Sequence, residues 1–237
     1  MGRIFDAGFM ISTVPGIVAY LPVTLLLTAI ASFVGLIIGF AAAMVRFFKI
    51  PYAAAFCRFY ISFIRGTPTL VQLLLVYYGL PILLGAINVR FGTDLSVNAV
   101  PKLVFASAAL SVNAGAYMSE TIRSAVMSVD AGQMEACYSV NMSTAQAMRR
   151  IILPQAFVVA LPPLGNSFIS MLKETSLVFN ISVVEIMAQS RLIASRSFRF
   201  FEVYIVVSVL YWICCIVLEH LLARLETALR GYERGAV

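Results

Sequence analysis

Four polar side chains recur at helical spacing near the end of a long apolar run. They are Asn166, Ser170, Lys173 and Glu174. Because residues three or four positions apart lie on one face of a helix, they would form a single polar stripe. The stripe offers donors for a carboxylate and an acceptor for an ammonium group, so it suits a zwitterionic solute. The alternative is that Lys173 and Glu174 mark the outer end of the helix and hold a subunit interface.

A second polar stripe is expected in the preceding apolar run, where Asn113, Tyr117 and Glu120 follow similar spacing. Arg123 comes three residues after Glu120, and we expect this pair to be structural and to fix the helix near an inner gate. Gln72 lies in an earlier apolar run, and it suits either the same pathway or a packing role. Polar and ionisable groups inside a membrane usually face a cavity or a partner, which makes these residues candidates.

The composition indicates that lipid surrounds most of the chain. Of the 237 residues, 61% are hydrophobic and only 12% are charged. A soluble domain has roughly 45–50% apolar and about 25% charged residues. A chain this apolar cannot cover itself with a polar surface, so we predict an integral membrane protein that forms one domain over residues 1–237.

Charge-free runs predict five membrane-spanning helices, with four or six as alternatives. The runs are bracketed by Asp6 and Arg46, Arg65 and Arg90, Lys102 and Glu120, Arg150 and Lys173, and Glu202 and Glu219. A span needs about 20 apolar residues, and flanking Lys and Arg side chains can extend the shorter third and fifth runs. The first run is longer than one span. Its early part, with Pro15 and Pro22, is expected to lie outside the span or to kink its beginning.

The distribution of Lys and Arg favours an orientation with the N-terminus outside and the C-terminus in the cytoplasm. In that orientation ten of the 17 basic residues lie on the inner side and six on the outer side, and Lys173 lies inside a span. The inner ten are Arg46, Lys49, Arg58, Arg65, Arg123, Arg149, Arg150, Arg224, Arg230 and Arg234. An excess of basic residues inside is the usual pattern. The net charge of +6 therefore reflects topology, and no nucleic-acid motif accompanies it.

Two shorter features connect and pack the predicted spans. Residues 51–64 are rich in aromatic side chains and predict a short interfacial helix. The run Arg65-Gly66-Thr67-Pro68 ends that helix, and Pro68 suits the first turn of the next one. In the first span, Gly35 and Gly39 are four residues apart, a spacing that lets helices approach closely in lipid.

The longest polar interruption, residues 128–154, predicts two short helices joined by a tight turn. Asp130 can cap the first helix, and Ser143 with Gln146 forms a capping-box pattern for the second. Asn141 lies between them and tolerates the left-handed conformation that ends many helices. An ordinary loop would need only a few residues. Two capped helices therefore indicate an element to which another protein docks, and Pro154 begins the next span.

Several kinds of chemistry are not expected of this chain. The four cysteines form no CxxC pair and are read as small buried residues, while His220 has no ligand partner nearby in the sequence. We therefore expect neither a metal site nor catalytic residues. The sequence contains no Gly-x-x-x-x-Gly-Lys-Ser/Thr loop and no Gly-Lys pair, so it cannot bind ATP in the usual manner. Energy for any active process would have to come from a partner.

The docking element resembles the EAA motif of permeases from binding-protein-dependent ABC importers. The resemblance rests on Glu135-Ala136-Cys137, Asn141-Met142, Ile151 and Leu153-Pro154, with the motif's spacing. Cys137 stands where the family has a second Ala, and Asn141 where it usually has Gly. In that family the loop is a coupling helix in a groove of the ATPase subunit. The resemblance thus implies that Glu135, Ala136, Cys137, Asn141, Met142, Leu153 and Pro154 form the coupling element.

The resemblance extends over nearly the whole chain after about residue 21. It includes Phe63 to Pro68, Val71-Gln72, Tyr77 to Pro81, Gly115 to Tyr117, Leu161 to Leu164 and Lys173 to Leu177. These runs are similar to polar amino-acid permeases, and the runs 166–177 and 192–212 are most like L-cystine permeases. The implied fold is all-α, with about five transmembrane helices and a cytosolic coupling loop, as in type I ABC importers.

The resemblance also implies the partners. They are two copies of an ATPase that binds ATP and Mg²⁺, a second permease subunit that is either the same or a related chain, and an extracytoplasmic solute-binding protein. Three other classes were weighed. A secondary transporter usually shows more spans and an internal repeat, and a small channel needs no large docking helices. A membrane enzyme would need a nucleophile–base pair or a metal cluster, and the sequence shows no such spacing.

Overall fold

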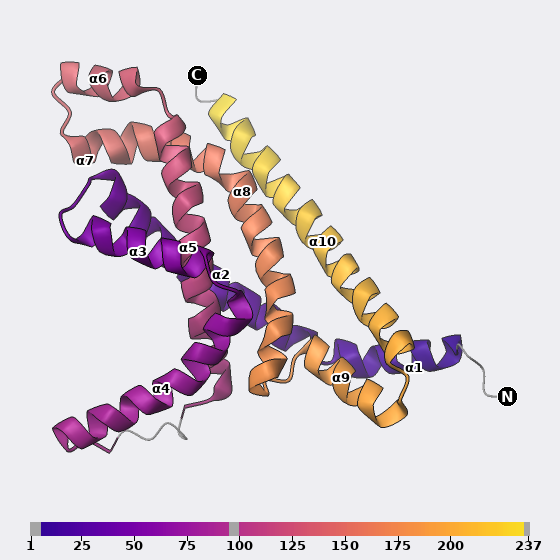
Figure 1. Ribbon diagram of the computed structural model, residues 1–237. Helices are drawn as coiled ribbons and strands as arrows, with labels where there is room; N and C mark the ends of the chain where they lie inside the picture. Colours follow the sequence, from indigo (N-terminus) through magenta and orange to yellow (C-terminus); the bar gives the residue numbers. More distant parts are fainter. Residues whose placement is uncertain (1–5, 95–99, 235–237) are drawn as a thin grey trace.

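The computed structural model describes residues 6–94 and 100–234, with side chains as far as Ala228. Within these residues the secondary structure is helical (Figure 1). The elements, in chain order, are α1 (Ala7–Val18), α2 (Leu21–Phe47), α3 (Ala53–Arg65), α4 (Thr69–Phe91), α5 (Lys102–Ser128), α6 (Ala131–Ser139), α7 (Thr144–Ala147), η2 (Met148–Ile152), α8 (Leu153–Glu174), η3 (Thr175–Ile181), α9 (Ile186–Ser197) and α10 (Phe200–Arg234).

The long apolar run at the N-terminus divides into two helices. The carboxylate of Asp6 caps α1 by accepting a hydrogen bond from the Phe9 amide at 3.1 Å. A break at Ala19 and Tyr20 separates α1 from α2, and Pro22 lies in the first turn of α2, where its missing N–H costs nothing. The early part of the run therefore forms a separate helix outside the first span. This was one of the two predicted possibilities, and the other was a kink at the beginning of the span.

Among the described residues, five helices are long enough to cross a membrane. Four of them also have the apolar composition of a span: α2, α4, the segment Thr144–Ile181 that contains α8, and α10. The fifth, α5, has 27 residues and a less apolar composition, because it is surrounded mainly by protein. It carries the largest number of buried residues in one helix and packs against α2, α4 and α8. The five predicted spans correspond to these five helices.

The contact between α2 and α5 is very close because both helices carry glycines there. A Cβ at Gly35 would come within 2.5 Å of the Ala114 Cβ, and one at Gly39 within 3.0 Å of the Gly115 carbonyl oxygen and the Ser119 amide. Separations under 3.0 Å do not occur between real Cβ atoms and their neighbours. The predicted packing role of the Gly35 and Gly39 pair is confirmed.

The segment between the first two spans forms α3, as predicted, and it crosses α5 (Figure 1). A break at residues 66–68 separates α3 from α4. Pro68 is the N-cap of α4, one position before the first-turn position predicted for it. The buried residues of α4 are Gln72 and Leu73, near its beginning. Figure 1 shows the rest of this helix projecting from the bundle. Most of α4 is therefore available to lipid or to another subunit.

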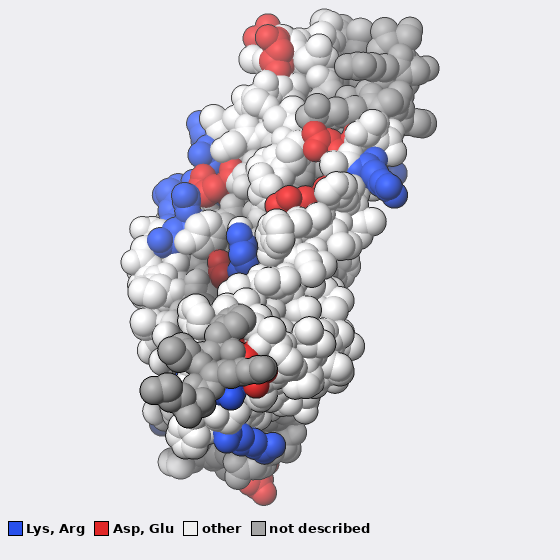
Figure 2. All heavy atoms as spheres, turned by 90° about the vertical axis from the view of Figure 1, so that its right-hand side faces the viewer, with Lys and Arg blue, Asp and Glu red and all other residues white. Residues whose placement is uncertain are grey.

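The two ends of the bundle carry different structures. The short helices α6 and α7 lie at one end, together with the C-terminal part of α10, whereas α9 and the beginning of α1 lie at the other (Figure 1). Between α7 and α8 the chain passes through η2, a turn of π-helix. Figure 2 shows that uncharged residues form most of the face it presents, as expected of a surface in contact with lipid.

Candidate functional site

The polar stripe predicted on α8 lies on an exposed face of that helix. The side chains of Asn166, Ser170 and Lys173 are exposed, whereas Ile169, Met171 and Leu172 on other sides of the helix are buried against the bundle. Within the described part of the chain, these three polar side chains make no hydrogen bond or ion pair of their own. Polar groups are costly against hydrocarbon. This face therefore suits a water-filled path or a second subunit rather than lipid.

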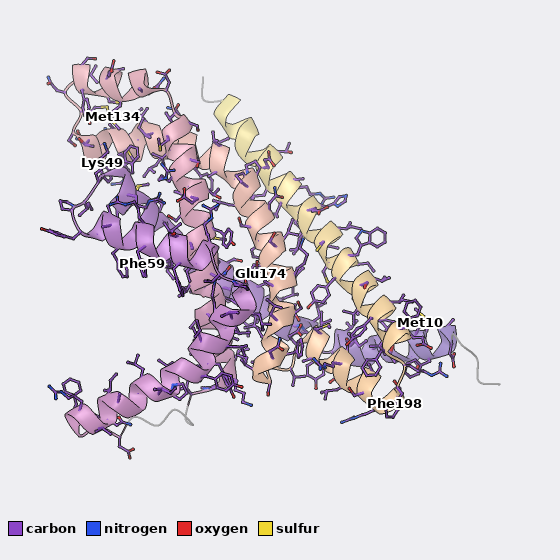
Figure 3. All side chains as sticks on the ribbon, in the orientation of Figure 1. Met10, Lys49, Phe59, Met134, Glu174 and Phe198 are labelled. Carbon is purple, nitrogen blue, oxygen red and sulfur yellow. The ribbon has the colours of Figure 1, made fainter. Side chains whose placement is uncertain are left out.

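Glu174 lies beside that face but is more deeply enclosed, near the middle of the molecule (Figure 3). Its carboxylate lies close to the hydroxyl of Thr69, at the beginning of α4. The Oε2 atom of this carboxylate is buried and has no hydrogen-bond partner in the described structure. Glu174 and the neighbouring Lys173 form no ion pair with each other. Glu174 thus retains unused capacity to accept a hydrogen bond.

Gln72 and Asn113 are buried and form a polar network that reaches Thr69, close to Glu174. The Gln72 Nε2 donates to the Ile64 carbonyl at 2.7 Å and to the Thr67 carbonyl at 2.9 Å. The Asn113 Nδ2 donates to the Gln72 Oε1 at 2.8 Å and to the Thr69 hydroxyl at 3.3 Å. The two amides therefore hold the break between α3 and α4 against α5. Of the two roles open to Gln72, this geometry favours packing.

The residues of the stripe expected on α5 point in different directions. Asn113 is 1% exposed, whereas Tyr117 is 43% exposed, and the Arg65 guanidinium lies 5.6 Å from the centre of the Tyr117 ring. Glu120 forms an ion pair with Arg123 at 3.3 Å, as predicted, and a second one with Arg46 of α2. The pair expected from the sequence is thus part of a triad that ties α2 to α5.

Two residues that organise the interior were not among the predicted site residues. Thr69 accepts a hydrogen bond from Asn113 and lies close to Glu174, but a threonine after a proline indicates only the beginning of a helix. Glu185 is fully buried and accepts hydrogen bonds from Thr24 at 3.2 Å and from Tyr211 at 3.0 Å. It connects α9 to α2 and α10. Its signal in the sequence was a lone carboxylate among Val183, Val184 and Ile186.

The predicted docking element is two short helices joined by a tight turn. Asp130 caps α6 through the Gly132 amide, and Ser143 and Gln146 form a complete capping box on α7. Asn141 has a φ of 60°. The Asn141 amide donates to the Tyr138 carbonyl and the Met142 amide to the Cys137 carbonyl, both at 3.0 Å, which is the Schellman pattern. The local predictions for this element are confirmed.

The two faces of α6 differ. Cys137 is buried, and Met134 packs with Met148 and Ile152 in a hydrophobic cluster that also contains residues of α2, α5 and α8. On the other face, the exposed residues are Glu135, Ala136, Tyr138, Ser139 and Val140. Val140, at the end of α6, is an exposed apolar side chain beside them, at 69%. The element is firmly attached to the spans and presents a free surface.

The remaining motif residues lie where the chain enters α8. Leu153 is half-buried and packs against the same hydrophobic cluster, and Pro154 is exposed in the first turn. Among the described residues there is no group of three or more His, Cys, Asp or Glu side chains that could hold a metal ion, and the four cysteines are free. His220 is exposed on α10.

Comparison with known proteins gives the class of the chain. Residues 35–231 match the family described as the inner membrane component of binding-protein-dependent transport systems. The chain is 42% identical to the probable amino-acid permease protein YxeN of Bacillus subtilis over 94% of its own length and 96% of that protein. It is also 42% identical to the L-cystine transport system permease protein TcyL of Bacillus subtilis, over 92% and 89% of the two chains.

A solved structure agrees with these relatives. The structure of an amino acid ABC transporter with histidines matches with a TM-score of 0.81 and 35% identity, over 95% of this chain and all of that one. The chain therefore belongs to the inner membrane components of binding-protein-dependent transport systems. It is a multi-pass component of a bacterial inner membrane and not an enzyme, and the resemblance seen in the sequence is confirmed.

Proposed function

We propose that this chain is the permease subunit of an ABC importer that moves a polar amino acid, most plausibly L-cystine, into the cytoplasm. The observation that carries this proposal is the exposed polar face of α8, which ends at the incompletely bonded carboxylate of Glu174. Two relatives named as L-cystine permeases, at 42% and 38% identity, support cystine as the substrate. Relatives named for nopaline and glutamine are 34% identical.

In the proposed pathway, the zwitterion is bound by groups of both kinds on one helix. The Lys173 ammonium and the Asn166 amide donate to the substrate carboxylate, while Glu174 accepts from the substrate ammonium group. Ser170 adds a hydroxyl between them on the same face. Asn113 and Gln72 act indirectly, since their hydrogen bonds position Thr69, which lies close to Glu174. Tyr117, with Arg65 stacked on its ring, lies on the exposed side of α5.

Energy for transport would enter through the loop of about residues 128–154 within a single permease domain. We assign the exposed Glu135 and Ala136 to contact with the ATPase, and Asn141 and Met142 to the turn that fixes their position. Cys137 joins them to the cluster that Leu153 also contacts, and Pro154 begins α8. Movement of the loop would thus reach α2, α5 and α8 together. ATP and Mg²⁺ belong to the ATPase, and this chain binds no cofactor.

The proposed assembly has two permease subunits, either two copies or this chain with a related one, and two ATPase subunits. The coupling loop and the C-terminus face the cytoplasm, and the N-terminus faces outward. There an extracytoplasmic binding protein delivers the amino acid. The beginning of α1 and the end of α10 lie at opposite ends of the bundle, as expected of a helix bundle with an odd number of spans (Figure 1). The excess of basic residues on the loop side supports the direction.

The proposal is tested by reconstituting the chain in vesicles with its ATPase and binding protein and measuring ATP hydrolysis and uptake. We expect cystine to stimulate ATP hydrolysis and to be taken up only when ATP is present on the loop side. Stimulation by another polar amino acid and not by cystine would reject the substrate. Uptake driven by a proton gradient without ATP would reject the importer and favour a secondary transporter.

A further inference from the structure

The turn between α2 and α3 contains a basic pocket with a volume of about 390 Å³. Four cationic side chains line the pocket: Arg46 of α2, Lys49 of the turn, Arg58 of α3 and Arg123 of α5. Two residues of the turn, Lys49 and Tyr52, have positive φ angles of 52° and 60°. This conformation is costly for non-glycine residues. The turn therefore has a definite backbone shape. Its residue Lys49 lies near the end of the molecule that carries α6 and α7 (Figure 3).

The positive charge of this pocket is only partly compensated. Glu120 is the one carboxylate paired with these cations in the described structure, and it is shared by Arg46 and Arg123. Neither Lys49 nor Arg58 has an ion-pair partner among the residues that the structure describes. The Nε of Arg123 is buried and has no hydrogen-bond acceptor there. The pocket thus offers several unused donors to an anion.

An exposed aromatic surface continues from the pocket along α3. Tyr52 is 92% exposed, Phe56 is 71% exposed and Phe59 is 69% exposed, and the Phe59 ring stacks on Phe63. The opposite face of α3, with Ala54, Ile61 and Ile64, is buried. A helix with one aromatic side free beside a group of cations is typical of the boundary between lipid headgroups and acyl chains. The two surfaces together match an amphiphile, not a small inorganic anion.

We propose that this pocket binds the headgroup of an anionic phospholipid, whose acyl chains lie along the exposed aromatic side of α3. The phosphate would be held by Lys49 and Arg58, with the buried Nε of Arg123 behind them. Basic pockets between membrane helices on the cytoplasmic side are suited to such headgroups. This inference goes beyond the proposed function and does not depend on which solute is transported.

The bound lipid would stabilise the part of the bundle that carries the docking element. Met44 and Phe47, in the last turn of α2, pack in the same hydrophobic cluster as Met134 of α6. A headgroup that holds the α2–α3 turn therefore also restrains the end of α2 against α6. The lipid would contribute to the alignment of the docking element without contacting its exposed face.

The test uses fluorescence from a tryptophan placed beside the pocket. The only native tryptophan, Trp212, is removed by Trp212→Phe, and Phe56→Trp introduces the probe into the full-length chain in nanodiscs. Quenching by phospholipids with brominated acyl chains then gives relative affinities. We expect brominated phosphatidylglycerol to bind on the order of tenfold more tightly than brominated phosphatidylcholine, because two free cations face the headgroup.

Variants of the pocket test whether its cations cause the preference for phosphatidylglycerol over phosphatidylcholine. The double variant Lys49→Gln with Arg58→Gln should abolish this preference, and Lys49→Gln alone should reduce it several-fold. The matched control, Arg196→Gln, removes an exposed cation on α9 at the other end of the bundle and should leave it unchanged. Equal quenching by both lipids would overturn the proposal, as would a preference that survives the double substitution. Loss of the preference on adding inorganic phosphate would also overturn it, by assigning the pocket to a free anion.

Discussion

Thr69 is a small residue with a large effect on the arrangement of the polar groups. Its hydroxyl accepts a hydrogen bond from Asn113 at 3.3 Å and lies close to Glu174, so the buried amides of α4 and α5 meet the carboxylate of α8 at this residue. The Glu174 Oε2 atom is buried and has no hydrogen-bond partner among the described residues. An unpaired acceptor next to exposed donors is the arrangement that binding a zwitterion requires.

Removing a substrate-facing group should lower transport without disturbing assembly. We expect Asn166→Ala or Glu174→Gln to reduce the uptake efficiency about tenfold or more, since hydrogen bonds to charged groups contribute about 1.5–3 kcal/mol. The measurement is uptake in vesicles, together with co-purification of the ATPase. Ser167→Ala is a suitable control, because the Ser167 hydroxyl already donates a hydrogen bond to the Pro163 carbonyl, at 2.9 Å. Unchanged kinetics in the first two variants would remove these residues from the pathway.

The turn between α6 and α7 depends on the left-handed conformation of Asn141. Asn141→Val should destabilise the turn by about 1–2 kcal/mol, whereas Asn141→Gly should be tolerated. Hydrogen exchange of the Met142 amide, which bonds to the Cys137 carbonyl, reports on this directly. Faster exchange is expected for the valine variant only. Equal exchange in both variants would show that the conformation of Asn141 does not hold the turn.

Local patterns predicted single residues well, and long-range contacts were missed. The capping box of Ser143 and Gln146 and the turn at Asn141 depend on neighbours a few residues away. Arg46 lies 74 residues from its partner Glu120, and Thr24 lies 161 residues from Glu185. No spacing rule connects residues so far apart. For the same reason, Asn113 and Tyr117 were assigned to one stripe although only Tyr117 is exposed.

Among the elements, α5 is the central one, and its composition reflects this place. Its neighbours supply the apolar surroundings that lipid supplies to the other spans, so small and polar residues are tolerated along it. Charged residues lie near the ends of α4 and α8 because charges are excluded from the hydrocarbon. Glu120 and Glu219, which were expected to end spans, instead lie within α5 and α10. The break between α1 and α2 could not be assigned from the sequence, since no charge separates the two helices.

The close contact between α2 and α5 predicts a strong dependence on side-chain size. Gly35→Ala or Gly39→Ala should destabilise the chain by about 1–3 kcal/mol through overpacking, and so lower the thermal midpoint in detergent by several degrees. Gly79→Ala and Gly85→Ala are matched controls on α4, where a Cβ would meet no atom within 4 Å. A loss of stability as large in the controls would show that the cost is not one of helix packing.

At the scale of the whole molecule, two exposed surfaces support the proposed second permease subunit. α4 is little buried, and the polar face of α8 is open. A second subunit that covers both would enclose the polar face and leave apolar surface toward lipid. The sequence predicted the spans and the docking element, but how the exposed faces are covered depends on a second chain. No pattern within one chain encodes that arrangement.

The orientation of the molecule can be measured by labelling at its two ends. In a chain without its native cysteines, Ser139→Cys lies on the exposed face of α6, and Phe198→Cys lies at the corner between α9 and α10 (Figure 3). A membrane-impermeant maleimide should label the second site from outside and the first only in inverted vesicles. Labelling of Ser139→Cys from outside would place the docking element out of reach of any ATPase.

The most direct test of the central claim is the amount of amino acid imported per ATP hydrolysed in the reconstituted transporter. Glu135→Ala removes the exposed carboxylate of the docking element, and Glu219→Ala removes an exposed carboxylate on α10 as a control. The Glu135 variant should lower the ratio about tenfold, as loss of one charge-assisted hydrogen bond predicts, while binding-protein docking persists and the control keeps the normal ratio. A normal ratio in Glu135→Ala would contradict the claim that ATP hydrolysis drives transport through this loop.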